Sequence, residues 1–312
     1  MFIDRLIANI KKSNNPTVVG LDTKLDYIPA SIREQSFREF GENSAGISDA
    51  IIQFNKRLIN AIYDIVPAVK PQMAYYEIYG ADGIKAFSET CAYARSKGML
   101  VIADGKRNDI GTTAQAYSDA YLGEMQIGDK KQSMFEIDAL TVNPYLGYDG
   151  IKPFAEACAK YDKGIFILVK TSNKSSGQLQ DLITDDGKHI YEKVAELVNE
   201  WGSSLIGEYG YSSIGAVVGA TWPEQAKVLR QVMNKAYILV PGYGAQGGTA
   251  KDAVQSFNSD GLGAIINASR SILCAWKSEQ WSGKYNEDSF DIAARAEALR
   301  MRNDINEALE GK

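Results

Sequence analysis

The chain of 312 residues has one histidine, three cysteines and few prolines. A metal site built on several histidines of this chain is therefore excluded, and a Ser-His-Asp triad would have to use His189, which lies in a polar stretch. Cys91, Cys158 and Cys274 are far apart and odd in number, so neither a disulfide framework nor a thiolate zinc site is expected. If the chain is an enzyme, its acid–base chemistry is expected to use Lys, Asp or Glu.

Long apolar runs and excess positive charge are also missing. No run approaches the roughly 20 apolar residues that span a bilayer, and Asp4 and Arg5 interrupt the N-terminus where a secretory signal would be apolar. A net charge of −5 gives no electrostatic reason to expect nucleic acid or an anionic membrane as partner. The hydrophobic share of 45% and the charged share of 23% are typical of a globular protein. We expect a cytoplasmic protein.

Short apolar runs recur along the chain and alternate with amphipathic, helix-like stretches. This alternation predicts an α/β fold with a parallel sheet, and eight strands are enough to close a (β/α)8 TIM barrel. A doubly wound open sheet is the structural alternative. The predicted strands are Thr17–Leu21, Ile65–Val69, Met99–Ala103, Ala139–Val142, Gly164–Val169, Ile214–Val218, Tyr237–Val240 and Gly263–Ile266.

No linker divides the chain, so residues 1–312 are expected to form a single domain. Its length beyond the roughly 250 residues of a typical barrel is assigned to long loops near residues 33–46, 123–133, 173–188 and 277–287. The tail Asp291–Leu309 is predicted to be a helix, with Ile292, Leu299, Ile305 and Leu309 buried.

Charged residues follow the third predicted strand at short spacing. Asp104, Lys106 and Asp109 stand where the chain would leave the sheet, so two carboxylates could hold one lysine protonated. Lys70, at the end of the preceding strand, extends this alternation of charge. A protonated lysine is a proton donor, whereas imine formation needs a neutral amine. A structural ion-pair network would give the same pattern.

A glycine-rich segment follows the seventh predicted strand. Its sequence Pro241-Gly-Tyr-Gly-Ala-Gln246-Gly247-Gly248 could bring successive backbone N–H groups close to an anion. Arg270, after the eighth strand, could clamp phosphate oxygens. Glycine also serves tight turns, but barrels commonly bind phosphate after strands seven and eight. A phosphate site is the favoured interpretation.

These motifs together resemble the orotidine 5′-phosphate decarboxylase family. The resemblance rests on Asp104-x-Lys106-x-x-Asp109-Ile110, on Lys70 one strand earlier, and on the PG-x-GAQGG loop with Arg270. It spans Asp22 to Arg270, and the longer loops are similar to those of a bacterial and protozoan-like branch of the family. The resemblance implies decarboxylation of orotidine 5′-monophosphate to UMP and carbon dioxide without a cofactor or metal.

The resemblance also implies roles for individual residues. Lys106 would protonate C6 of the pyrimidine, Asp104 would lie near the departing carboxylate, and Lys70 and Asp109 would complete the charge network. The remaining contacts would be Asp22, Lys70 and Gln72 to the ribose; Ser172, or alternatively Thr171 or Asn173, to the pyrimidine; Gln246 between pyrimidine and phosphate; and Gly248 and Arg270 to the phosphate. Pro241 and Gly247 would be further substrate-binding residues.

A homodimer is the further implication. Asp109, Ile110 and Thr113 would complete the active site of the neighbouring subunit. Three alternatives remain open at this point. They are a magnesium-dependent sugar-phosphate enzyme of the same superfamily, expected to have an acidic metal ligand in place of Lys70, a Schiff-base aldolase, and a phosphoribosyl-binding protein without activity.

Overall fold

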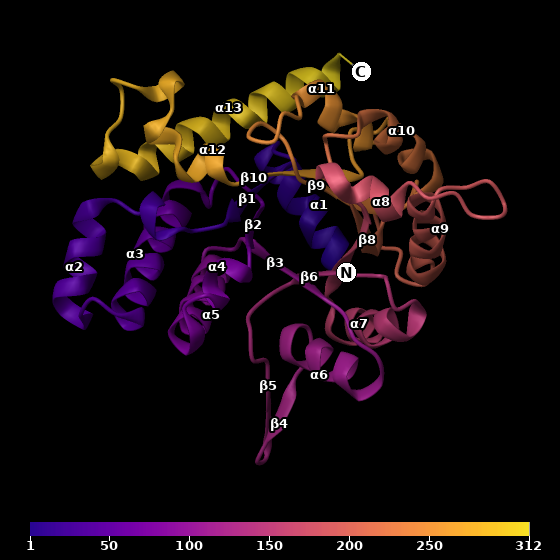
Figure 1. Ribbon diagram of the computed structural model, residues 1–312, viewed down its shortest axis with the longest axis horizontal. Helices are drawn as coiled ribbons and strands as arrows, with labels where there is room; N and C mark the ends of the chain where they lie inside the picture. Colours follow the sequence, from indigo (N-terminus) through magenta and orange to yellow (C-terminus); the bar gives the residue numbers. More distant parts are fainter. Residues whose placement is uncertain (312) are drawn as a thin grey trace.

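A computed structural model of the protein describes residues 1–311. Eight parallel strands close into a barrel in the order β1-β10-β9-β8-β7-β6-β3-β2, surrounded by helices (Figure 1). The predicted (β/α)8 barrel is confirmed, and the open-sheet alternative is wrong. The barrel strands are β1 (Thr17–Leu21), β2 (Ala68–Pro71), β3 (Leu100–Arg107), β6 (Ala139–Val142), β7 (Gly164–Lys170), β8 (Ser212–Val218), β9 (Ala236–Val240) and β10 (Ala264–Ala268).

The helices alternate with these strands, as the spacing of apolar residues predicts. They are α1 (Phe2–Ser13), α2 (Ala30–Phe40), α3 (Ser44–Ile62), α4 (Ala74–Glu77), α5 (Gly80–Ser96), α6 (Gly111–Tyr121), α7 (Tyr148–Tyr161), α8 (Gly177–Gln180), α9 (Ile190–Gly202), α10 (Pro223–Val232), α11 (Ala250–Ala253), α12 (Arg270–Leu273) and α13 (Phe290–Glu310). Short 3₁₀ turns η1 to η6 cover Leu25–Tyr27, Lys174–Ser176, Val254–Ser256, Ala275–Lys277, Glu279–Trp281 and Glu287–Ser289. Within residues 1–311, none of the helices has the length and apolar character needed to cross a membrane.

Strand boundaries differ from the predictions at two places near the site. The second strand begins at Ala68, because Ile65 and Val66 form a turn in which both N–H groups donate to the Ile62 carbonyl. Both side chains are buried, so the apolar residues at 65 and 66 belong to a packed turn and not to the strand. The third strand continues to Arg107, so Asp104 and Lys106 belong to the strand, whereas Asp109 follows it.

Helix α1 closes the N-terminal end of the barrel. Phe2, Ile3, Leu6, Ile7 and Ile10 recur at helical spacing, and all are buried against inward-facing residues of the barrel strands. Figure 1 shows α1 behind the ring of strands. The sequence prediction did not include this helix.

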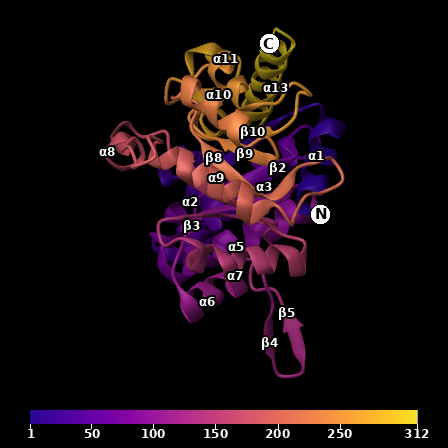
Figure 2. The same cartoon turned by 90° about the vertical axis from the view of Figure 1, so that its right-hand side faces the viewer.

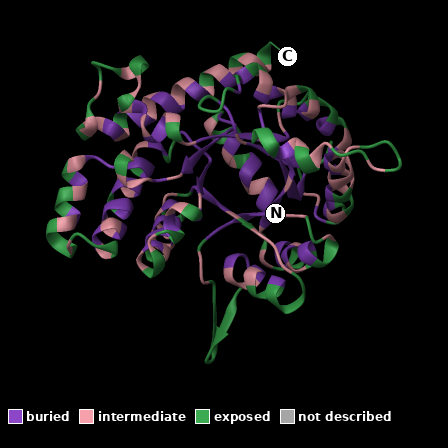
Figure 3. Cartoon of the chain, viewed as in Figure 1, coloured by how far each residue is buried: buried purple, intermediate pink, exposed green. Residues whose placement is uncertain are grey.

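All four predicted long loops contain some regular structure: η2 and α8 lie within residues 173–188, and η5 lies within residues 277–287. Residues 33–46 lie mostly in α2 and in the first turn of α3, whose N-cap Asn43 accepts hydrogen bonds from the N–H groups of Ala45 and Gly46. The loop prediction for this segment is therefore wrong. Residues 123–133 contain the hairpin of β4 (Met125–Ile127) and β5 (Lys130–Gln132), which projects from the barrel and is exposed (Figures 2 and 3).

The C-terminal helix is confirmed, but one of its predicted core positions is wrong. Ile292 is 56% exposed, whereas Phe290, Met301 and Ile305 are buried. Leu299 and Leu309 are only partly buried against the core. The long helix therefore packs the face that contains Phe290, whose ring stacks on Phe54 of α3 at 4.6 Å between centroids.

Candidate active site

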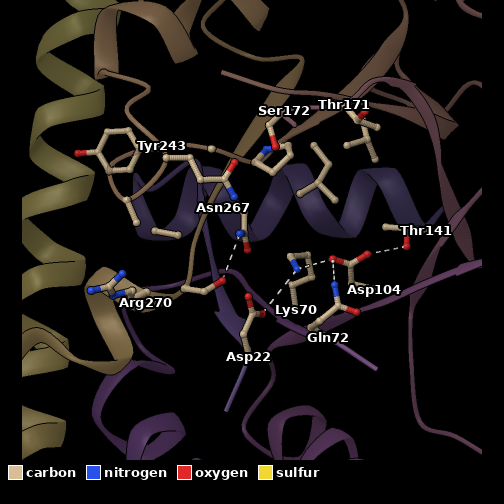
Figure 4. Close-up of a pocket in the computed structure, with 18 of the residues that line it drawn as sticks. Asp22, Lys70, Gln72, Asp104, Thr141, Thr171, Ser172, Tyr243, Asn267 and Arg270 are labelled. Carbon is tan, nitrogen blue, oxygen red and sulfur yellow. Dashed lines mark hydrogen bonds and ion pairs between the residues drawn. The ribbon is translucent and has the colours of Figure 1, made fainter. Parts of the chain in front are cut away.

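A cavity of about 630 Å³ opens at the C-terminal ends of the barrel strands (Figure 4). This volume is in the range typical of small-molecule sites. Most of the predicted site residues line it, and they come from every part of the chain between β1 and α12. Those residues are Asp22, Lys70, Gln72, Asp104, Lys106, Thr171, Ser172, Asn173, Pro241, Gln246 and Arg270.

A chain of alternating charges forms the floor of the cavity. Lys70 Nζ lies 2.7 Å from Asp104 Oδ2, and Lys106 Nζ lies 2.5 Å from Asp104 Oδ1. Asp22 Oδ1 is 4.0 Å from Lys70 Nζ on the other side. One buried carboxylate thus binds two ammonium groups, and β1, β2 and β3 supply this chain of charges.

Burial and charge act against each other in this network. Burial by itself would raise the pKa of Asp104, but the charges of Lys70 and Lys106 hold that pKa well below its ordinary value. Burial would likewise lower the pKa of Lys70, but Asp104 and Asp22 outweigh it and raise the pKa. Lys70 and Asp104 are therefore both charged at neutral pH.

Two further side chains fix the orientation of the Asp104 carboxylate. Gln72 Nε2 donates to Oδ2 at 2.9 Å, and Thr141 Oγ1 donates to Oδ1 at 2.9 Å. The Thr141 hydroxyl also accepts a hydrogen bond of 3.0 Å from the Lys106 N–H. Each carboxylate oxygen thus has one ammonium and one neutral donor, which leaves it little freedom to rotate.

Lys106 stands at an irregularity of the β3 backbone. Its φ of +47° lies in the left-handed region, which side chains other than glycine and asparagine rarely adopt. The register of β3 against β6 shifts between Ala103 and Arg107, as at a β-bulge. Bulges redirect a side chain next to active sites, and this one directs Lys106 back to Asp104.

Two polar oxygens of the cavity are buried without a hydrogen bond. Asp22 Oδ1 and Asn267 Oδ1 have no hydrogen-bond partner among residues 1–311. Buried polar atoms are normally satisfied, so both oxygens are suited to accept hydrogen bonds from a ligand. Asn267 directly follows the Ile265–Ile266 core of β10, but the sequence prediction did not assign it to the site.

The glycine-rich loop differs from the prediction in how it uses its N–H groups. The Gly247 N–H donates to Gly244 O at 2.8 Å, and the Gly248 N–H donates to Gly242 O at 3.0 Å. Neither Gly247 nor Gly248 lines the cavity. A Cβ at position 248 would lie 2.7 Å from Gly242 O, so close packing of the loop requires this glycine. The N–H groups of Gly247 and Gly248 are therefore used within the loop, whereas Ala245 and Gln246 line the cavity.

The structure distinguishes two of the three candidates for contact with the pyrimidine. Thr171 uses all of its polar atoms: its N–H donates to Gln180 Oε1, its carbonyl accepts from Trp222 Nε1, and its hydroxyl bonds Asn173 and Gln180. The Ser172 carbonyl accepts from Thr221 Oγ1 at 3.1 Å. Ser172 still has its N–H and hydroxyl for a ligand, so we prefer it to Thr171.

Asp109, Ile110 and Thr113 lie away from this cavity. None of them lines it, and the Ile110 side chain is 56% exposed. Asp109 Oδ1 accepts a hydrogen bond from the Ile110 N–H at 2.8 Å, just before the start of α6. Within one chain, the network of opposite charges therefore contains Asp22 and not Asp109, which the sequence pattern had included.

Sequence reasoning also missed several residues that line the cavity. Lys24 lies 5.6 Å from the Tyr27 ring centre and 5.5 Å from that of Tyr75, and all three side chains line the cavity beside Asp22. Lys24 follows β1 as closely as Lys106 follows the core of β3, so its position was a usable signal. Thr141, inside an apolar strand, gave no such signal.

The comparisons with known proteins agree with this geometry. Residues 48–282 match the model of the orotidine 5′-phosphate decarboxylase / HUMPS family. The chain belongs to this family. An orotidine 5′-phosphate decarboxylase of Rhodopirellula baltica is 45% identical over 310 residues, and one of Caldicellulosiruptor bescii is 42% identical over 308, with 99% of both chains covered in each case.

A solved structure of another family member has the same fold. The OMP decarboxylase of Leishmania donovani superposes with a TM-score of 0.74 at 29% identity, over 99% of this chain and 98% of that one. The resemblance to this family that the sequence motifs indicated is thereby confirmed.

Proposed function

We propose that the protein is a carboxy-lyase that converts orotidine 5′-monophosphate to UMP and carbon dioxide, the last step of de novo UMP synthesis. The observation that carries this proposal is the chain of charges Lys70–Asp104–Lys106 at the mouth of the barrel, in which Lys70 and Asp104 are buried. The full-length similarity to proteins named orotidine 5′-phosphate decarboxylase supports it. Cytoplasmic location stays a prediction from composition.

Lys106 acts in this proposal as the proton donor at C6. The bond from C6 to the carboxylate breaks, its electron pair stays on C6, and the Lys106 ammonium neutralises that charge and then transfers a proton to the carbon. A preorganised cation at the atom where charge develops is an effective form of catalysis. The Lys106 side chain is 46% exposed, so solvent can return the proton.

Asp104 keeps Lys106 in place and lies beside the departing carboxylate. Because its charge is shared by two ammonium groups and two neutral donors, it cannot turn away when substrate enters. Lys70, held between Asp104 and Asp22, supplies the second positive charge. The chain's own side chains thus provide both the proton and the field, and the proposal gives no step to a cofactor or metal.

The rest of the cavity binds the parts of the substrate that do not react. Asp22 and Lys70 contact the ribose hydroxyls, with Gln72 beside them, and Ser172 contacts the edge of the pyrimidine. Gln246 joins the pyrimidine to the phosphate, and Arg270 with the backbone near Pro241 holds the phosphate. Binding energy from these remote groups can orient the ring at Lys106.

A second subunit completes the site in this proposal. Asp109, Ile110 and Thr113 are at the surface of one chain, where they can extend into the cavity of a partner related by two-fold symmetry. The homodimer is therefore proposed as the active form.

A direct ultraviolet assay tests the proposed reaction. Wild-type protein should remove the orotate absorbance of orotidine 5′-monophosphate and form UMP, with and without EDTA, whereas Lys106→Ala should show negligible conversion. Loss of activity in EDTA would favour a magnesium-dependent relative. No turnover by correctly folded wild-type protein would refute the proposal, and full turnover by the variant would remove Lys106 from the mechanism.

A further inference from the structure

A buried lysine lies just outside the cavity and has no part in the proposed chemistry. Lys170 is the last residue of β7, and its side chain is 0% exposed. Its ammonium forms an ion pair with Asp181, which follows α8. It also lies over the rings of Trp222, at 4.7 Å, and Tyr191, at 5.4 Å. A buried charge is retained only where its partners are well placed.

Thr171 and Gln180, the sequence neighbours of Lys170 and Asp181, connect the same two segments a second time. Gln180, just before Asp181, accepts a hydrogen bond from the Thr171 N–H at 3.0 Å and donates one to Thr171 Oγ1 at 2.9 Å. Trp222 Nε1 donates to the Thr171 carbonyl at 2.9 Å. Two successive residues at the end of β7 are thus joined to two successive residues at the end of α8.

The single histidine, His189, also contacts Asp181. His189 Nδ1 lies 2.9 Å from the Asp181 carbonyl oxygen, and its ring stacks on Tyr191 with 5.1 Å between centroids. The segment from Gln180 to Asp181 is therefore fixed to the end of β7 and to His189, the N-cap residue of α9. Residues 172–179 lie between the two fixed points. Ser172 is held through its carbonyl by Thr221 Oγ1, which leaves residues 173–179 of the loop, and Leu179 among them is 46% exposed.

We infer that Lys170 and Asp181 form an anchor that positions Ser172 at the cavity and confines movement of the loop to residues 173–179. This inference rests on the proposed function, because it assumes that Ser172 contacts the pyrimidine. Lys170 is a positioning residue, since it acts through Thr171 and Gln180 and does not line the cavity. Without the anchor, the bound pyrimidine has to order this segment, so substrate affinity falls.

The test compares Lys170→Met and Asp181→Asn with a matched control. Lys193→Met removes two exposed ion pairs of α9, in which Lys193 Nζ lies 3.0 Å from Asp186 Oδ2, in the segment between α8 and α9, and 3.1 Å from Glu196 Oε2. Both anchor variants should raise the KM for orotidine 5′-monophosphate by about tenfold or more with a smaller effect on kcat, as expected when ground-state and transition-state binding weaken together. The control should leave KM within about twofold of wild type.

Amide hydrogen exchange tests the anchor in the ligand-free protein, independently of catalysis. In both anchor variants, ligand-free amides of residues 171–182 should exchange about tenfold faster than in wild type, and those of the control should not. The double variant Lys170→Met/Asp181→Asn should be no worse than the worse single variant, because both remove one interaction.

Several outcomes would overturn the inference. They are an unchanged KM with unchanged exchange in the anchor variants, a loss confined to kcat, or additive effects in the double variant. If Lys170→Met does not fold, Asp181→Asn carries the test, since the Asp181 side chain is 39% exposed and its replacement is nearly isosteric. Failure of the proposed reaction is separate, because it would show as inactivity of wild-type protein with normal exchange.

Discussion

Mixing two inactive variants gives a quantitative test of the shared active site. In a two-fold dimer built as proposed, Lys106→Ala damages the chain's own site, whereas Asp109→Ala damages the partner's site. When the two chains are mixed, one site of each mixed dimer has both defects and the other has neither. Asp109 lies outside its own chain's cavity and Ile110 beside it is 56% exposed, which is why we place the second defect in the neighbour.

The magnitude follows from counting sites. Random pairing of equal amounts makes about half of the dimers mixed, and each has one intact site of two, so about one quarter of wild-type turnover should return. The ultraviolet assay measures it, after chain exchange has been confirmed with two different affinity tags. A mixture of Lys106→Ala with Asp104→Ala is the control, because both defects then lie in the same half-site and no intact site can form.

The result that would refute the reasoning is equally specific. If mixed dimers form and turnover stays at the level of the separate variants, Asp109 does not act across the subunit interface. If Asp109→Ala alone retains wild-type turnover, Asp109 is not needed at all.

The remaining predictions concern the charge network and the core. Asp104→Asn should lower the pKa of Lys70, because burial then outweighs the remaining carboxylate of Asp22; nitrogen NMR of the lysine ammonium measures this, and an unchanged pKa would contradict the proposed balance. In wild type that pKa is raised, so the stabilisation from Lys70 is present below the unfolded value of about 10.4 and is lost as pH rises through the folded value. Thr141→Val should reduce kcat by about ten- to a hundredfold with KM nearly unchanged, since a hydrogen bond to a charged group contributes about 1.5–3 kcal/mol. Steady-state kinetics measures both constants, and an unchanged kcat would contradict the role given to Thr141. Phe2→Ala should lower the free energy of unfolding in urea by about 3–5 kcal/mol, whereas Ile292→Ala should change it by no more than about 0.5 kcal/mol, and equal effects would show that α1 is not part of the core.

The barrel itself was readable from the sequence because buried parallel strands appear as short, continuous apolar runs. Thr17–Leu21 and Ala139–Val142 are confirmed to the residue. The false start at Ile65 arose because a buried turn and a buried strand have the same composition. Helix α1 was missed although its apolar residues have helical spacing, since Asp4 and Arg5 were considered only as interruptions of a signal sequence.

Part of the site could also be predicted from the sequence, for a different reason. Charged residues directly after apolar runs had to meet at one end of the barrel, which located Lys70, Asp104 and Lys106. The left-handed backbone of Lys106 has no sequence signal, because glycine is the residue that usually indicates a positive φ. Thr141 looked like any other β-branched strand residue, and only the fold shows that its hydroxyl joins Asp104 to the Lys106 N–H. The single-domain interpretation and the dimer contacts stay predictions.

The N-terminal helix has a consequence for how products leave. Because Phe2, Leu6 and Ile7 fill the lower end of the barrel together with inward-facing strand residues, the described chain offers no passage through the middle. Substrate, carbon dioxide and UMP must all use the mouth beneath the 173–179 and 244–247 loops. Carbon dioxide formed beside the buried Asp104 therefore has to pass the bound nucleotide or leave after it, so both products share one exit.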